Sequence, residues 1–426
     1  MNSQRHLLSV LVFLLSLMAF SCALAADGFV PALPSDTEGE VLVAGNYSNF
    51  EALEAAFDRF SEYYPDAYLS YHKLDGYNSV LGAALISEEK PTICHTYLWM
   101  RNNPNYQDLF LSMENLADPA LGLDFSLIRD EMLTFEEDGS LFMLPIFSTT
   151  YGVLVNEAIF EKEGLSYPAT YAELLDACAK LKAAGYPSPI MGCPVSGQMS
   201  LPLCYPILCA ALSEHPDQVA LLNSMDPAGA QILKPLAEQL RELMDLGCID
   251  LEACQSIPDD YNGLILRFFE GDVPMMVASG DTVSGTRKRE SQSQAFMEHP
   301  FPYTFRPVPF TEEGGYFLNC TSIEFSVNKN SEDLTLTNEF IRFLLSPGEL
   351  DQMAKDKRLV TVTKDMSLDG IYSAFEQVAP GHSLNEQQIG LNDPAIIQMR
   401  LMLDDIMKGE KTVQEALDAY GTYVKQ

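Results

Sequence analysis

Near the start of the chain, the spacing of apolar positions changes from that of a strand to that of a helix. Residues 41–44 form a short apolar run, typical of a strand buried on both faces. Ser48 and Glu51 have the spacing of a capping box that would start a helix. Apolar residues then recur every three or four positions: Phe50, Leu53, Phe57, Phe60 and Tyr64. Pro65 ends this pattern and residues 67–71 form another apolar run, so the sequence predicts a βαβ unit.

Helices and short strands are expected to alternate along the rest of the chain, which predicts the α/β class. Three more sequences have capping-box spacing: Thr170 to Glu173, Ser346 to Glu349, and Thr412 to Glu415. Helices are therefore expected to begin near residues 171, 347 and 413. At 426 residues the chain is too long for one ordinary hydrophobic core, which favours two lobes.

The first 25 residues have the features of an export signal. Arg5 and His6 precede an apolar run over residues 7–20, and Ala-Leu-Ala at residues 23–25 fits a cleavage site. The apolar run is too short for a bilayer core, which needs about twenty residues. The sequence therefore predicts a signal peptide over residues 1–25 and a mature protein that works outside the cytoplasm.

Two outcomes of export are open. Residues 19–22, Ala-Phe-Ser-Cys, resemble a lipobox, in which Cys22 would be lipidated and anchor the protein at the cell surface. Cleavage after Ala25 would instead release the chain to the periplasm or the extracellular space.

The charge balance excludes two kinds of partner. The chain has 26 basic and 60 acidic residues, a formal net charge of −34. This charge repels nucleic acids and anionic membranes, so neither is expected to bind. The acidity either keeps an exported protein in solution or indicates a preference for cationic ligands.

The cysteines do not indicate a metal or cofactor site. Eight follow Cys22, among them Cys248 and Cys254, which flank a predicted turn and are close enough in sequence to pair. Cys204 and Cys209 lie in an apolar stretch and are expected to be core thiols. The chain has no CxxC sequence and only six scattered histidines, so we expect neither a metal ion nor a cofactor.

From residue 144 onward the order of segments resembles a known family. Leu-Pro-Ile-Phe-Ser-Thr-Thr-Tyr-Gly at residues 144–152 leads into an apolar run, then Ile-Phe-Glu-Lys-Glu-Gly-Leu at residues 159–165 and a helical pattern to Gly185. This order resembles the family 1 extracellular solute-binding proteins of ABC importers, whose best-known members capture maltose and other oligosaccharides. Further segments resemble later parts of that family in the same order: residues 269–276, 305–309, 325–331, 339–347 and 408–417.

The resemblance implies a two-lobed periplasmic-binding-protein-like fold (type II) with three interlobe crossovers. Lobe 1 would comprise residues 27–146 and 311–358, and lobe 2 residues 151–305 and 360–426. The crossovers would then lie near residues 146–150, 307–310 and 359–362. It also implies a monomeric binding protein, not an enzyme, that captures a small solute, most simply a sugar. The closed form would dock on the transmembrane permease subunits of the importer.

A sugar offers hydroxyl groups and an apolar ring face, so its site needs aromatic side chains beside amides and carboxylates. In parallel sheets such ligands bind at the carboxyl ends of strands. The candidate residues from lobe 1 are Asn46, Tyr47, Tyr77, Tyr97 and Trp99. Those from the hinge and lobe 2 are Phe147, Tyr151, Gln198, Tyr205, Asp281 and Tyr316.

One departure from the family bears on the ligand. Sugar-binding members carry a tryptophan just after the glycine where this chain has Gly280 and Asp281. Asp281 would either cap a helix or bind a hydroxyl or cationic group. The alternative function is therefore binding of a cationic or other non-sugar solute, such as an amino acid, peptide or polyamine. A remoter alternative is a thiaminase-like enzyme of the same fold, with Cys94 or Cys193 as nucleophile.

Overall fold

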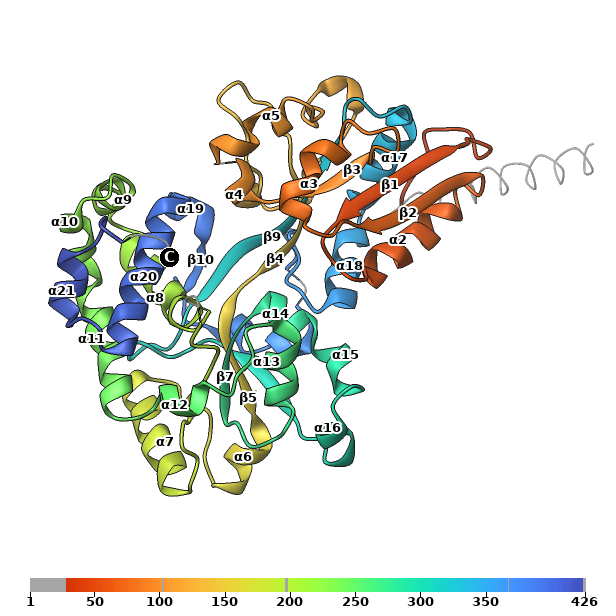
Figure 1. The fold of residues 1–426 in the computed structure, drawn as a ribbon. Coiled ribbons are helices and arrows are strands. Elements are labelled where there is room, and N and C mark those ends of the chain that lie inside the picture. Colours follow the sequence, from red (N-terminus) through yellow and green to blue (C-terminus); the bar gives the residue numbers. More distant parts are fainter. Residues whose placement is uncertain (1–27, 102, 196–197, 367, 424–426) are drawn as a thin grey trace, which may run out of the picture.

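The structure, a computed structural model, describes residues 28–101, 103–195, 198–366 and 368–423 (Figure 1). The predicted signal peptide over residues 1–25 and its lipobox cysteine, Cys22, lie outside these residues. No helix in the described part of the chain is long and apolar enough to cross a membrane. Helices and strands alternate, which confirms the α/β class.

The larger sheet has six strands in the order β10-β9-β3-β1-β2, with β4 also paired to β9. β1 is parallel to β2 and β3, whereas β9 is antiparallel to β3 and β4. The predicted βαβ unit is confirmed as β1, α2 and β2. The strands are β1 (Gly39–Gly45), β2 (Ala67–Lys73), β3 (Ile93–Thr96), β4 (Leu144–Thr149), β9 (Phe317–Val327) and β10 (Ser383–Asn385).

Helices cover this sheet and extend from its strand ends. They are α2 (Glu51–Ser61), α3 (Tyr77–Ala84), α4 (Leu98–Arg101), α5 (Gln107–Phe110), α17 (Leu334–Leu344) and α18 (Glu349–Lys357). The apolar face predicted for α2 is buried, and Phe57 and Phe60 pack against Phe340 of α17. Short 3₁₀ turns complete this part: η1 (Pro104–Tyr106), η2 (Pro119–Leu121) and η3 (Asp130–Met132).

The smaller sheet has four strands in the order β6-β7-β5-β8. They are β5 (Tyr151–Asn156), β6 (Ile190–Met191), β7 (Met275–Ser279) and β8 (Tyr303–Arg306). The helices around it are α6 (Glu157–Lys162), α7 (Tyr171–Ala183), α8 (Ser200–Leu212), α9 (Pro216–Asn223), α10 (Pro227–Ala230), α11 (Lys234–Asp245), α12 (Leu251–Cys254), α13 (Tyr261–Phe268), α14 (Gly280–Ser284), α15 (Thr286–Glu290), α16 (Gln294–Glu298), α19 (Glu386–Ile389), α20 (Asp393–Lys408) and α21 (Val413–Asp418). Three more 3₁₀ turns are η4 (Gln231–Leu233), η5 (Gly370–Tyr372) and η6 (Phe375–Gln377).

Of the four predicted capping boxes, only that of Thr412 and Glu415 forms completely, and at α7 only the half made by Thr170 forms. Thr170 and Thr412 cap α7 and α21, which begin where predicted. Ser48 does not cap α2, because that helix begins later, with Phe50 before it and no side-chain cap. Ser346 does not cap α18, because its hydroxyl donates backwards to the Phe343 carbonyl oxygen (2.6 Å).

The two sheets are joined by neighbouring strands (Figure 1). β4 runs directly into β5, and Ser148 exchanges two backbone hydrogen bonds with Val360 (2.8 and 3.0 Å). The long strand β9 pairs with β4 and contributes to both hydrophobic cores: residues 317–320 pack with the smaller sheet and residues 323–327 with the larger. The predicted lobe boundaries therefore stay a prediction, since one strand contributes to both cores.

A buried arginine ties these segments together. Arg129 donates to the Asn319 side-chain oxygen on β9 (3.0 Å) and to the Thr361 carbonyl oxygen (2.7 Å). Burial lowers the pKa of Arg129 to about 10, so it stays charged at neutral pH. Such hydrogen bonds from a charged donor are stronger than neutral ones and fix the relative positions of β9 and the segment at Thr361.

Cys248 and Cys254, whose spacing would allow a disulfide, do not pair. All eight cysteines after Cys22 are free and buried in the structure. The Cys248 thiol lies beside Cys178, whereas Cys254 lies beside Ser188, so their side chains have different neighbours. Cys204 and Cys209 are core thiols, as predicted.

The central strand β9 also carries a buried carboxyl group without a partner. Glu324 is fully buried, and neither side-chain oxygen has a hydrogen-bond partner in the described residues. Burial raises the pKa of Glu324 to about 8, because removing the charged form from water is costly. The carboxyl group is therefore protonated at neutral pH.

We expect Glu324 to make the free energy of unfolding fall as the pH rises. Between about pH 4.5 and 8 the unfolded chain loses this proton and the folded chain keeps it. Each pH unit in that window should cost the wild type about 1.4 kcal/mol relative to Glu324→Gln, which cannot ionise. Urea unfolding of both proteins at pH 5, 6, 7 and 8 measures this difference. For the exposed control Glu312→Gln, the free energy of unfolding should change with pH in parallel with that of the wild type. If the Glu324→Gln curve is also parallel to the wild type, Glu324 does not have the raised pKa.

Candidate functional site

Loops at the carboxyl ends of β1 and β3 bring three predicted site residues together. The Tyr97 hydroxyl donates to the Asn46 side-chain oxygen (2.9 Å). The chain turns into α4 after Tyr97, so the Tyr97 and Trp99 rings stack, with centroids 6.1 Å apart. Asn46, Tyr97 and Trp99 all keep some exposure to solvent.

The conformation of this loop depends on Gly45 and His95. The His95 ring is buried and stacks on Phe325 at 5.5 Å. A Cβ atom on Gly45 would lie 2.3 Å from the His95 ring, so only glycine fits. Burial lowers the pKa of His95 to about 3, with the Lys357 charge adding to the effect, so the ring is neutral.

Tyr47 is held by two neighbours. Its backbone N–H donates to the Tyr71 hydroxyl (2.8 Å). The Lys357 ammonium, at the end of α18, lies 4.4 Å from the Tyr47 ring centroid. A cation at this distance is attracted to an aromatic face and covers it. One face of Tyr47 is therefore occupied by the protein itself.

Asp281 lies at the junction of the two sheets. It stands in the first turn of α14, but Ser279 caps that helix by accepting the Thr282 N–H, so the capping role expected for Asp281 is wrong. The Ser322 hydroxyl on β9 donates to Asp281 (2.5 Å). Burial raises the pKa of Asp281, and the Ser322 hydrogen bond and the Lys357 charge oppose this rise. The Asp281 side chain is therefore a partly exposed acidic group that Ser322 orients.

On the other side of this junction, two tyrosines meet a second carboxyl group. The rings of Tyr151 and Tyr205 lie edge to face at 5.7 Å. The Tyr205 hydroxyl, which is buried, donates to Glu386 of α19 (2.6 Å). Burial raises the pKa of Glu386, and the Tyr205 hydrogen bond opposes it.

Four predicted site residues contact side chains outside this group, although one of them, Tyr316, lines a small hollow together with Tyr151. Tyr77 is buried and donates to the His95 carbonyl oxygen (2.7 Å), which supports β3 from within. Phe147 is buried in the core of the larger sheet. Tyr316 stacks on His382 at 4.1 Å, and the Gln198 amide donates to Asp259 (2.8 Å). Binding roles for these four residues stay predictions without a geometric argument.

Sequence reasoning missed Tyr261, at the start of α13. The residue is 60% exposed, yet the surrounding protein raises the pKa of its hydroxyl to about 12, with the Asp281 charge adding to the rise. Ionisation of its hydroxyl would raise the pKa of Tyr47, Tyr97 and Tyr151, so these rings share one neighbourhood. A sequence signal that could have found Tyr261 is Asp260 directly before it. An aspartate at this position caps the start of α13, which makes Tyr261 the first residue of that helix.

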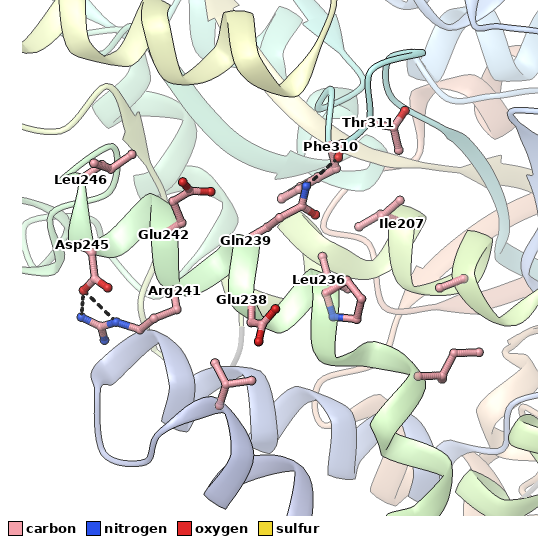
Figure 2. A pocket seen from close by; sticks show the side chains of 14 residues that line it. Ile207, Leu236, Glu238, Gln239, Arg241, Glu242, Asp245, Leu246, Phe310 and Thr311 are labelled. Atoms are coloured by element: carbon pink, nitrogen blue, oxygen red, sulfur yellow. Dashed lines mark hydrogen bonds and ion pairs between the residues drawn. The ribbon is translucent and has the colours of Figure 1, made fainter.

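A cavity of about 770 Å³ lies elsewhere, on the smaller-sheet side (Figure 2). α8, α11 and the segment at Phe310 line it, and the Gln239 amide donates to the Phe310 carbonyl oxygen (2.9 Å). None of the eleven predicted site residues lines this cavity. The described residues also contain no group of histidine, cysteine and acidic side chains arranged to hold a metal ion.

The fold and this site define an α/β protein in which two sheets contribute side chains to one group of tyrosines and carboxylates. A family model for bacterial extracellular solute-binding proteins matches residues 104–380, more than half of the chain. The chain therefore belongs to this family of bacterial extracellular solute-binding proteins. No curated protein sequence matches it.

Solved structures of sugar-binding proteins share the fold. RafE of Streptococcus pneumoniae, solved with raffinose, has a TM-score of 0.68 at 14% identity, over 90% of this chain and 98% of RafE. The GacH receptor of Streptomyces glaucescens, solved with acarbose, has a TM-score of 0.66 at 17% identity, over 91% of this chain and 97% of GacH. A Bacillus licheniformis sugar transporter in complex with stachyose has a TM-score of 0.57 at 15% identity, over 90% of this chain and 100% of that transporter. At these identities the similarity shows the fold.

We expect Gly45→Ala to disturb the loop of Asn46 and Tyr47. The new Cβ would clash with the buried His95 ring, which has no room to move. Overpacking of this kind destabilises by roughly 1–3 kcal/mol, which a thermal or urea unfolding curve measures. Gly82→Ala is the matched control, because nothing lies within 4 Å of its Cβ position inside α3. It should stabilise the protein by roughly 0.5–1 kcal/mol; equal effects of the two changes would contradict the assignment.

Proposed function

We propose that this protein is the solute-binding component of an ABC importer and that its solute is a carbohydrate. The observation that carries the proposal is the group of Tyr97, Tyr151 and Tyr261 around Asp281. Both sheets contribute to this group, because Tyr97 follows β3 and Tyr151 begins β5. The sugars named for RafE, GacH and the Bacillus licheniformis transporter support the same solute class.

The residue types suit a sugar. Aromatic rings pack against the apolar face of a pyranose, and hydrogen-bonding side chains bind its hydroxyl groups. Here Asp281 and Glu386 offer acceptors, and the Asn46 amide offers donors and an acceptor. Trp99, stacked on Tyr97, extends the aromatic surface at the end of β3.

A sugar held by residues of both lobes would favour closure, because only the closed form makes all the contacts. The strands β4 and β9 and the segment at Val360 would act as the hinge between the predicted lobes. The closed protein would dock on the transmembrane permease subunits. Export by the predicted signal peptide, with or without lipidation at Cys22, would place it outside the cytoplasm.

A cationic solute is the second candidate. Asp281 supports it, since a partly exposed carboxylate at the junction of the sheets would attract an ammonium group. The thiaminase-like alternative has one supporting contact, because the Cys193 thiol donates to the Asp259 carboxylate (3.6 Å), but the protonation of its cysteines does not favour it. Burial raises the pKa of Cys94 to about 12 and also raises that of Cys193, so both are protonated thiols and poor nucleophiles.

A thermal-shift panel separates the two solute classes. The panel contains raffinose, stachyose and maltotriose on one side and spermidine, arginine and a lysine-rich peptide on the other. A ligand at 100 times its Kd stabilises the folded protein by about 2.7 kcal/mol, which raises Tm measurably. We expect at least one oligosaccharide to raise Tm. A rise with cationic solutes alone would refute the carbohydrate proposal.

Tyr261→Ala should weaken the binding of the oligosaccharide that this panel identifies. Removing a stacked aromatic ring costs roughly 1–3 kcal/mol, which corresponds to about fivefold to 150-fold in Kd. Titration followed by Trp99 fluorescence measures the change. Tyr68→Ala is the control, because Tyr68 is equally exposed (62%) but lies on β2. Equal affinities of the two variants would show that Tyr261 does not contact the sugar.

A further inference from the structure

Basic side chains gather beside the candidate site, although the chain as a whole is strongly acidic. Arg287, Lys288 and Arg289 follow one another on α15, and Lys357 and Arg358 end α18. α15 lies near the smaller sheet and α18 near the larger (Figure 1). The two groups of cations lie close together, because Arg358 donates to the Thr286 hydroxyl of α15 (2.9 Å) and the Lys288 and Arg289 charges act on Lys357, as does that of Asp281.

Four of these five cations have polar partners within the protein. Arg287 pairs with Asp369 (2.9 Å) and Arg358 with Glu290 (3.2 Å). Arg289 donates to the Asn262 side-chain oxygen, next to Tyr261. Lys288 donates to Asn49 (2.9 Å), with Glu51 at 3.6 Å. Asn262, the partner of Arg289, is adjacent to Tyr261 in the sequence, and Asn49, the partner of Lys288, is two residues from Tyr47. Both cations are thus held beside residues of the candidate site.

Lys357 differs from the other four. Its ammonium lies over the rings of Tyr47 (4.4 Å) and Phe50 (5.8 Å) and forms no ion pair with any carboxylate of the described residues. Burial lowers the pKa of Lys357; Glu51 and Asp281 oppose this shift, and the Arg289 and Lys288 charges add to it. A half-buried ammonium beside two other cations is a place where an anion would be stabilised.

The opposite charge of the whole protein does not cancel this local attraction. Charges further away than the Debye length, about 8 Å at physiological ionic strength, are largely screened. Asp281 accepts the Ser322 hydroxyl, and Glu51 lies beside Lys288. Both carboxylates also act on Lys357, so the three cations Lys357, Lys288 and Arg289 and these two carboxylates leave one net positive charge for an incoming anion.

We propose that the solute carries a carboxylate which pairs with Lys357, so that the protein captures an acidic oligosaccharide that contains a uronic acid. The inference rests on the proposed function and narrows its solute class. Tyr97 and Tyr261 bind the sugar rings, Asp281 accepts a ligand hydroxyl, and the carboxylate lies beside Lys357, near Lys288 and Arg289. The Tyr47 ring, covered by Lys357, orients the ammonium and does not stack on the ligand.

The test compares acids with their own methyl esters, which have nearly the same shape and no charge. The probes are trigalacturonate, triguluronate and a glucuronate-substituted xylotriose, with raffinose and maltotriose as neutral sugars. Binding to wild type, Lys357→Gln, Lys357→Arg and the control Lys355→Gln is titrated by Trp99 fluorescence at 50 mM and 500 mM NaCl. Lys355 is exposed on the same helix, so its change tests for a general effect of charge.

We expect the wild type to bind at least one acid tenfold or more tightly than its ester, with a smaller preference at high salt. Lys357→Gln should abolish the preference, while Lys357→Arg and Lys355→Gln keep it. A purely structural role of Lys357 would weaken acid and ester equally, which overturns the inference.

Two further outcomes separate the inference from the function on which it rests. If neutral sugars or esters bind at least as well as every acid, the carbohydrate function stands and the inference fails. If no carbohydrate binds, both fail.

Discussion

The pairing of β4, β9 and the segment at Val360 is the constraint on which the rest of the structure depends. These three stretches lie side by side where the chain passes between the sheets, and backbone hydrogen bonds between Ser148 and Val360 fix their register. Arg129 adds side-chain bonds to two of them. In the proposed function these paired segments are the hinge, because backbone pairing resists shear but allows bending.

The same strands place the chemistry of the site. β9 presents Ser322 to Asp281 from its midpoint, and β4 leads directly into Tyr151. Residues from loops after β1 and β3 then complete the group from the other sheet. Each carboxylate near the site is oriented by a hydroxyl, Asp281 by Ser322 and Glu386 by Tyr205. The arrangement supplies acceptors whose directions are already set, which lowers the entropic cost of binding.

Sequence periodicity was sufficient for the α/β class and the first βαβ unit, because each depends on local spacing. It placed α7 and α21 correctly through Thr170 and Thr412, whereas the two failed caps depended on neighbouring turns that no spacing rule describes. The loop residues Asn46 and Tyr97 followed from the rule for parallel strand ends. Tyr261 and Lys357 could not be found in this way, because long-range packing alone brings α13 and α18 to those loops.

The eight free thiols give the protein a chemical property that its fold alone does not suggest. Every one is buried, so each is shielded from reagents as long as the chain stays folded. No disulfide links these eight cysteines in the described part of the chain. Alkylation of these sulfurs would then proceed only through molecules that have opened by local or global unfolding. The rate of labelling would therefore measure how often each core unfolds.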